Sequence, residues 1–237
     1  ANYLIPSRLV CFMSDDTILI ICAHPDDQIL GPGGTMAKYA REGYDVVTVI
    51  CTYGESSHPH IKREKIREIR LEESKDADKI VGGDGVLFLG LEDGNMSEDL
   101  KKRDNINKIR NLIREYEPTK IFTHSVDDLH PDHRAVRKAI LKSYDEVKKE
   151  AGFECDVYTF EVWNIVNLLK RKQPKLIVDI SKDFQTKIKA LHAFKSQISV
   201  FTHTVFNNLL YLGVYIKDFI NGVTHGYRFA EVFYKER

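Results

Sequence analysis

The chain has 237 residues, of which 43% are hydrophobic and 30% are charged, a composition typical of one soluble globular domain with a sizeable core. Lysine and arginine total 35, and so do aspartate and glutamate. The chain therefore lacks the basic excess that binders of the nucleic-acid backbone require, and we expect no nucleic-acid partner.

Neither the chain start nor a later apolar segment has the pattern of a targeting or membrane signal. Arg8 and Asp15 interrupt the first apolar patch, so residues 1–16 do not read as a signal peptide. The segment 205–220 carries two Asn, one Lys and one Asp and is too short to span a bilayer comfortably, which favours a core or subunit-interface helix and no membrane partner. The four cysteines show no metal-ligand spacing, which indicates reduced thiols and a cytoplasmic protein.

Short apolar runs alternate along the chain with longer amphipathic segments, the pattern of repeated β–α units around a mostly parallel sheet. The apolar runs predict strands at 17–22, 45–51, 86–89, 120–123, 157–161 and 175–178, with a closing strand near 227–234. The amphipathic segments predict helices at 35–42, 60–81, 97–115, 132–150, 182–196 and 204–221. We therefore expect a single domain over residues 1–237, with a three-layer, Rossmann-like α/β fold and helices on both faces of the sheet.

Histidines and aspartates are concentrated where the first four predicted strands end. The sequences at these ends are "AHPDD", "TYGESSHPH", "GLEDG" and "THSVDDLHPDH". Because the carboxyl ends of parallel strands meet at one edge of a sheet, these groups are expected to lie together.

Two adjacent carboxylates, Asp26 and Asp27, stand at the mouth of the first predicted strand, and like charges so placed indicate a nearby cation. The following "GPGG" suggests a phosphate-binding loop, but its spacing is not that of a dinucleotide fold, Pro32 removes a donor, and the carboxylates would repel a phosphate. A divalent metal fits better, because a His and an Asp of one turn can bind it and leave the neighbouring Asp as a base.

The segment "LHPDH", residues 129–133, offers a further metal ligand from another strand end. The alternative is that Asp132 only caps the following helix and that the two histidines are ordinary turn residues. The combination of His, Asp and His with one water, however, is typical of a catalytic zinc site.

"AHPDD" with "GPGG", then "HPDHR" and a closing "YRFAEVFYKE", resemble the PIG-L/LmbE family of zinc-dependent N-acetylglucosamine deacetylases over most of the chain. "GES" and "LGLEDG" are further similar to the archaeal diacetylchitobiose deacetylase type. The resemblance implies His24, Asp27 and His133 as metal ligands and Asp26 as general base and later acid. It also implies that His130 faces the oxyanion and that Asp132 holds this histidine charged and oriented.

The implied cofactor is Zn²⁺, with another divalent metal such as Fe²⁺ as the alternative, and the implied substrate is a small N-acetylated amino sugar. Arg70 in "IRLEE" and Asp93 in "GLEDG" are similar to family positions that hold sugar hydroxyls. Arg70 could instead be an exposed helix cation paired with a nearby glutamate, and Asp93 could serve only its Asp-Gly turn. The family usually has Glu where this chain has Gln28, from which we expect altered loop hydrogen bonding or metal affinity but not loss of activity.

The other histidines receive lesser expectations. His58 and His60 are expected on a solvated loop, His124 is expected to support the metal ligands, and His192 and His203 are expected to be structural. His225 is the residue of the C-terminal segment that could reach the active-site pocket. Relatives that form trimers or hexamers make a homo-oligomer a further expectation. Two other functions stay open: a non-haem iron oxygenase using the His/Asp/His set, and a non-catalytic sugar-binding protein.

Overall fold

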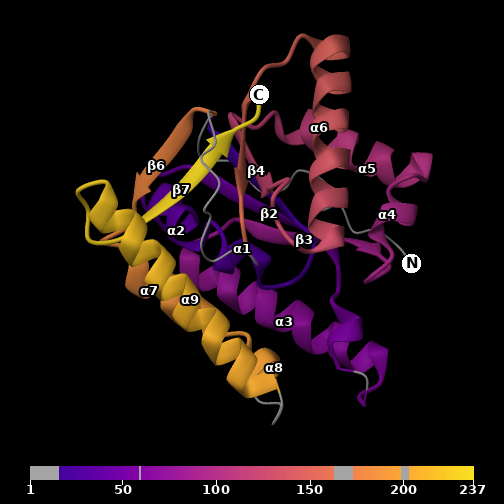
Figure 1. The fold of residues 1–237 in the computed structure, drawn as a ribbon. Helices are drawn as coiled ribbons and strands as arrows, with labels where there is room; N and C mark the ends of the chain where they lie inside the picture. Colours follow the sequence, from indigo (N-terminus) through magenta and orange to yellow (C-terminus); the bar gives the residue numbers. More distant parts are fainter. Residues whose placement is uncertain (1–15, 59, 163–172, 199–202) are drawn as a thin grey trace.

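The computed structural model describes residues 16–58, 60–162, 173–198 and 203–237 (Figure 1). Seven strands of these residues form one sheet in the order β3-β2-β1-β4-β5-β7-β6. The strands are β1 (Thr17–Cys22), β2 (Asp45–Thr52), β3 (Gly85–Leu91), β4 (Lys120–His124), β5 (Asp156–Phe160), β6 (Lys175–Asp179) and β7 (Ala230–Lys235). The first five pair in parallel, whereas β7 runs antiparallel to both β5 and β6. The predicted, mostly parallel α/β sheet is therefore confirmed.

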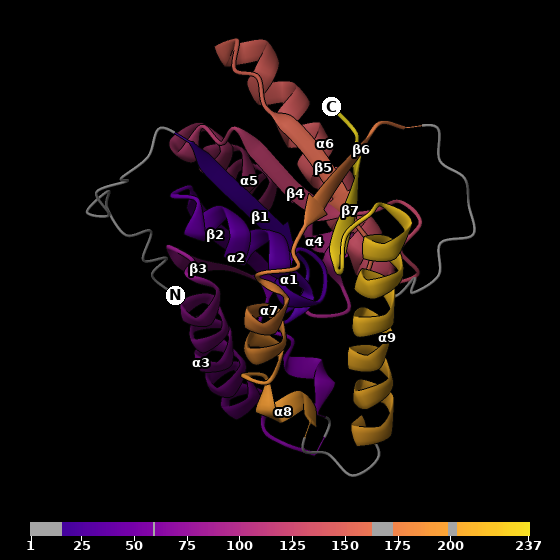
Figure 2. The same cartoon turned by 90° about the vertical axis from the view of Figure 1, so that its left-hand side faces the viewer.

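Successive side chains of a strand point to opposite faces of the sheet, and those of β1 are apolar or buried on both. Helices therefore cover both faces. Ile18 and Ile20 of β1 pack in one core with α2 (Gly33–Arg41), α3 (Arg63–Val81), α7 (Phe184–Leu191) and α9 (His203–Thr224). Leu19 and Ile21 pack in a second core with α4 (Met96–Asp99), α5 (Arg103–Tyr116) and α6 (Pro131–Ala151). Figures 1 and 2 show the two groups of helices on either side of the sheet.

Two predicted helices are each split in the structure. The helix expected at 97–115 breaks into α4 and α5, because the carbonyl of Asp99 accepts a hydrogen bond from the Asn105 side chain and its carboxylate accepts one from the N–H of Glu92. The helix expected at 182–196 breaks into α7 and α8 (Lys195–Ile198), where the carboxylate of Glu73 accepts bonds from the backbone and side chain of Ser196. Both breaks are set by side chains that compete with the helical pattern.

Two short elements were not predicted: the single turn α1 (Asp27–Leu30) and the 3₁₀ turn η1 (Glu55–Ser57). Both lie in loops that follow parallel strands, α1 after β1 and η1 after β2. No helix among the described residues has the length and apolar character needed to cross a bilayer.

Candidate metal centre and active site

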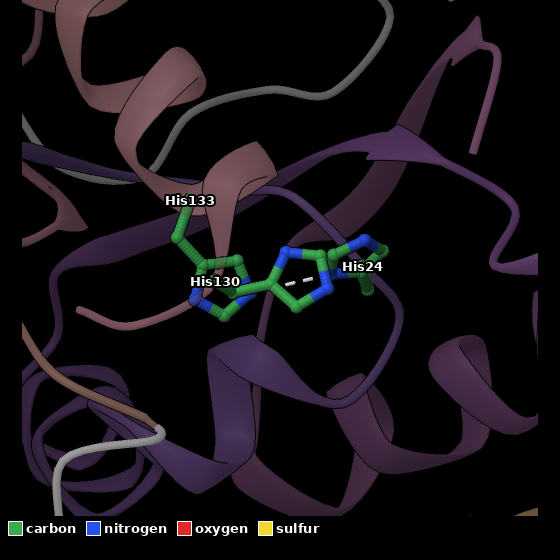
Figure 3. Close-up of side chains that lie close together, drawn as sticks. All are labelled: His24, His130 and His133. Carbon is green, nitrogen blue, oxygen red and sulfur yellow. Dashed lines mark hydrogen bonds between the residues drawn. The ribbon is translucent and has the colours of Figure 1, made fainter. Parts of the chain in front are cut away.

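Three potential ligand atoms, from His24, Asp27 and His133, converge beyond the end of β1. Figure 3 shows the rings of His24 and His133 close together, with that of His130 beside them. His24 Nδ1 lies 3.2 Å from His133 Nε2 and 3.4 Å from Asp27 Oδ2, and Asp27 Oδ2 lies 3.3 Å from His133 Nε2. A tetrahedral zinc ion with bonds of about 2.0–2.1 Å holds its ligand atoms about 3.3–3.4 Å apart. The donor set and its spacing therefore fit a zinc ion, and the structure brings together the three residues expected to bind it.

Local backbone structure places these three potential ligands. His24 follows β1, and its N–H donates to Asp27 Oδ2 over 2.8 Å, which fixes the carboxylate of the first residue of α1. His133 lies in the first turn of α6, which begins at Pro131, a residue favoured at the first helical position. Asp27 and His133 are buried, with 2% and 0% of their surface exposed.

Asp128 is a site residue that the sequence analysis missed. Its Oδ1 lies 2.9 Å from His133 Nδ1, and both side chains are fully buried. The carboxylate also accepts the backbone N–H groups of His130 and Val162. A carboxylate behind a histidine fixes the ring orientation and tautomer of a metal ligand. Burial opposes charging of His133, but Asp27 and Asp128 outweigh it and raise its pKa to about 9 in the absence of a metal.

His124 lies close to the centre, but the ring nitrogen that faces it already accepts a backbone hydrogen bond. Its Nε2 lies 3.4 Å from Asp27 Oδ2 but accepts the N–H of Ala23 over 2.9 Å, so its lone pair is already used. The ring stacks on that of His133, and burial lowers the pKa of His124 to about 4. This neutral ring packs behind His133, as expected for a supporting residue.

The described residues contain three overlapping sets of potential metal ligands. They are His24, His130 and His133; Asp27, His124 and His133; and His24, Asp93 and Asp132. Every set includes a member of the His24, Asp27 and His133 triangle, so all of them describe one polar centre. Within it, the three atoms of this triangle lie 3.2 Å, 3.3 Å and 3.4 Å apart, close to the tetrahedral value.

Asp26 stands beside the triangle in a strained conformation. Its φ of 108° is rare for a residue other than glycine and costs about 1–3 kcal/mol. Its carboxylate lies 3.2 Å from Nη2 of Arg70, which also donates to the carbonyl of Pro25. Burial raises the pKa of Asp26 to about 6, against the opposing charge of Arg70. Arg70 is buried rather than the exposed helix cation considered as an alternative.

Gln28 supports the same turn. Its side-chain carbonyl accepts the N–H of Asp26 over 3.0 Å, and the residue is 1% exposed. A glutamate could accept the same bond but would add a third carboxylate beside Asp26 and Asp27. The amide therefore preserves the hydrogen bond and removes a like charge from the turn.

The contacts of His130 and Asp132 differ from those that the resemblance implied. The backbone N–H of Asp132, not its carboxylate, contacts His130, donating to Nδ1 over 3.2 Å. The Asp132 carboxylate accepts the N–H of Gly94 and lies 3.5 Å from His24 Nε2. Burial and the nearby His24 and His133 lower the pKa of His130, which favours the neutral ring with its hydrogen on Nε2.

Asp93, His58 and His225 lie at the rim of this centre or away from it. Asp93 accepts the N–H of Ser56 and lies 3.4 Å from His24 Nε2, at the rim. The expectation of a solvated His58 is wrong, because the ring is 8% exposed and contacts the carbonyl of Ser196 in α8. His225 lines a separate cavity of about 280 Å³ between α9 and β7, bonded to the carbonyl of Asn221.

Residues 19–144 match the protein-family model described as PIG-L, GlcNAc-PI de-N-acetylase, which covers more than half of the chain. The chain belongs to this family. It is 29% identical over 193 residues to the probable N-acetyl-alpha-D-glucosaminyl L-malate deacetylase 2 of Bacillus cereus, an alignment that covers 76% of this chain and 83% of that protein.

Solved structures share the fold. N,N'-diacetylchitobiose deacetylase from Pyrococcus horikoshii superposes with a TM-score of 0.74 at 20% identity, covering 93% of this chain and 84% of that one. GalB, the 4-carboxy-2-hydroxymuconate hydratase of Pseudomonas putida KT2440, superposes with a TM-score of 0.77 at 20% identity, covering 94% and 96%. Because a hydratase has this fold too, the fold alone does not define the activity.

Proposed function

We propose that this chain is a metal-dependent N-deacetylase that removes the acetyl group from an N-acetylglucosamine unit of a small saccharide or glycoconjugate. The observation that carries the proposal is the zinc-sized triangle of His24, Asp27 and His133 beside the buried carboxylate of Asp26. Family membership supports it, as do relatives named as deacetylases of N-acetylglucosaminyl compounds. The exact sugar, such as diacetylchitobiose, is left to the assay.

His24, Asp27 and His133 would hold the metal, and zinc is our proposed ion. When bound, zinc lowers the pKa of a water molecule and polarises the acetyl carbonyl. The carboxylate of Asp26 then accepts a proton from the attacking water and returns it to the departing amine nitrogen. The guanidinium of Arg70, 3.2 Å from this carboxylate, holds it in place.

His130 and the rim residues complete the proposed site. Because His130 Nδ1 accepts a backbone hydrogen bond, its Nε2–H is available to donate to the oxygen that becomes negative. We propose Asp93, whose side chain is 11% exposed, as a contact for a sugar hydroxyl. Arg70 is proposed as a second contact, on the side of its guanidinium shared with Asp26. Asp132 orients His24 in this scheme.

The test measures bound metal and acetate release together, over a panel of N-acetylglucosamine compounds and without oxygen. Asp26→Asn is expected to keep the metal and lose activity, because only the proton acceptor changes. His133→Ala is expected to lose both. Full activity in either variant contradicts the mechanism. Activity that requires oxygen and a 2-oxo acid would instead indicate an iron oxygenase. Sugar binding without turnover, whichever metal is supplied, would indicate a non-catalytic protein.

A cytoplasmic, oligomeric enzyme is part of the proposal. Cys22, Cys51 and Cys155, the described cysteines, are free thiols, as is usual in a reducing compartment. Helix α9 buries Val214 in the core, which accounts for part of its apolar character. Its other side exposes a row of large apolar side chains: Leu212, Ile216, Phe219, Ile220 and Val223. A trimer or hexamer stays a prediction, to be checked by native mass.

A further inference from the structure

A lysine is fully buried beneath the loop that joins α1 to α2, directly after the turn that carries Asp27. Lys187 of α7 is 0% exposed, and its Nζ donates to the carbonyl of Gly31 (3.0 Å), to Asp218 of α9 (2.8 Å) and to Glu231 of β7 (2.6 Å). Burying an ammonium group costs several kcal/mol unless it is paired and hydrogen-bonded. The three bonds of this ammonium group, to a loop, a helix and a strand, therefore offset the cost of burying it.

The bonds of this cluster end on both sides of the loop that joins α1 to α2. Lys187 holds the carbonyl of Gly31, whose own N–H donates to the carbonyl of Asp27 over 2.9 Å and so ends α1. The carboxylate of Glu231 accepts the N–H groups of Gly34 and Thr35, at the start of α2. The loop is thus anchored at its beginning by a cation and at its end by an anion.

The loop has no room to move toward the sheet. A Cβ atom added to Gly31 would lie 2.3 Å from the Phe160 ring, and one added to Gly34 would lie 2.6 Å from Ile180. Helix α1 has only four residues, and a single helical turn does not hold its shape by itself. The position of α1, and of Asp27 as its first residue, therefore depends on contacts from outside the turn as well as on the bond from His24.

We propose that Lys187 is a positioning residue for the metal centre: through the Gly31 carbonyl it fixes α1, and with it the Asp27 carboxylate, against His24 and His133. The inference rests on the proposed function, because it takes Asp27 as a metal ligand. Lys187, Asp218 and Glu231 all lie beyond residues 19–144, the segment that matches the family model. The carboxyl-terminal part of the chain thereby sets the geometry of a site whose ligands all lie in the matched segment.

The test uses the charge-balanced double variant Lys187→Met/Asp218→Asn. It removes the bond to Gly31 but leaves Glu231 bonded to α2, and replacing a buried ion pair by neutral side chains is often tolerated. We expect a folded protein whose zinc affinity, measured by competition with a chromophoric chelator, is about tenfold weaker, as for other residues that orient metal ligands. The visible absorption of the Co²⁺-loaded protein should also change, because it reports the ligand geometry.

The matched control is Arg41→Met/Asp183→Asn, which removes a two-bond ion pair between the last residue of α2 and the residue that precedes α7, away from the loop. It should keep wild-type zinc affinity and Co²⁺ absorption. Asp218→Asn alone keeps the bond to Gly31 and should also bind zinc normally; an equal loss there overturns the proposal.

The outcomes separate this inference from the proposed function. A wild-type chain that binds no divalent metal contradicts the proposed function. A wild-type chain that binds zinc, with a folded double variant that binds it within twofold as tightly, overturns the role of Lys187 only. If the double variant does not fold, Lys187→Leu/Asp218→Leu replaces it, an apolar pair that cannot donate to Gly31, and wild-type zinc affinity in that variant overturns the inference equally.

Discussion

Asp128 offers a direct test of how the metal centre is held, through the variant Asp128→Asn. The asparagine is nearly the same size but keeps only one acceptor oxygen, that of its carbonyl. In the protein, however, the two oxygens serve different partners: Oδ1 lies 2.9 Å from His133 Nδ1, and Oδ2 accepts the N–H of Val162 over 2.8 Å. One of these donors must therefore face an NH₂ group in the variant.

The size of the effect follows from what the carboxylate does for the ligand. Loss of a group that orients a metal-binding histidine typically weakens metal binding 10- to 100-fold, or about 1.4–2.7 kcal/mol. We expect zinc affinity to fall by this factor in chelator competition. Activity should return when zinc is supplied in excess, because neither the three ligands nor Asp26 has changed.

Asp99→Asn is the control for this variant. Asp99 is another buried carboxylate that accepts a backbone N–H, that of Glu92 over 2.8 Å, but it contacts none of the ligands. It should lower the melting temperature and leave zinc affinity unchanged. Zinc affinity within twofold of wild type in folded Asp128→Asn would refute the role given to Asp128.

Two further variants test packing and buried charge. Gly31→Ala places a methyl group 2.3 Å from the Phe160 ring and should reduce the free energy of unfolding by about 1–3 kcal/mol; wild-type stability in urea would contradict the packing. Burial and the nearby Asp84 raise the pKa of Asp78 to about 7, so the folded state binds its proton more tightly than the unfolded state and wild-type stability falls as the pH rises from about 4 to 7. Asp78→Asn should therefore gain roughly 1–4 kcal/mol over wild type at pH 8 but little at pH 4; an equal gain at both would contradict the shift.

The sheet and the place of the site could be predicted because they depend on local patterns. Each predicted strand overlaps an observed one, and parallel pairing of β1, β2, β3 and β4 brings their carboxyl ends to one edge. The polar sequences after those ends therefore meet, whatever the details of the loops. A metal site shared by the His and Asp residues of these loops could be proposed for this reason, whereas the particular set of His24, Asp27 and His133 followed from the family resemblance.

The support around the ligands could not be predicted, since it depends on contacts between distant segments. Asp128 stands in a loop rich in polar residues, and only the rule that metal-binding histidines are held by carboxylates would have singled it out. Lys187 reads as an ordinary polar position of an amphipathic helix, and its burial depends on Asp218 and Glu231. The break between α4 and α5 depends likewise on one side chain, Asn105, reaching the carbonyl of Asp99.

The strained backbone at Asp26 indicates a functional role for this residue, beyond its part in the fold. A φ of 108° suits glycine better than aspartate, so stability alone does not explain a carboxylate there. Gln28 holds its N–H, while Arg70 holds both its carboxylate and the preceding carbonyl. These contacts keep the carboxylate that we propose as the proton acceptor beside a zinc-sized set of potential ligands. A hydratase can share the sheet, so the case for amide hydrolysis rests on this pairing of a base with a potential metal site and not on the fold.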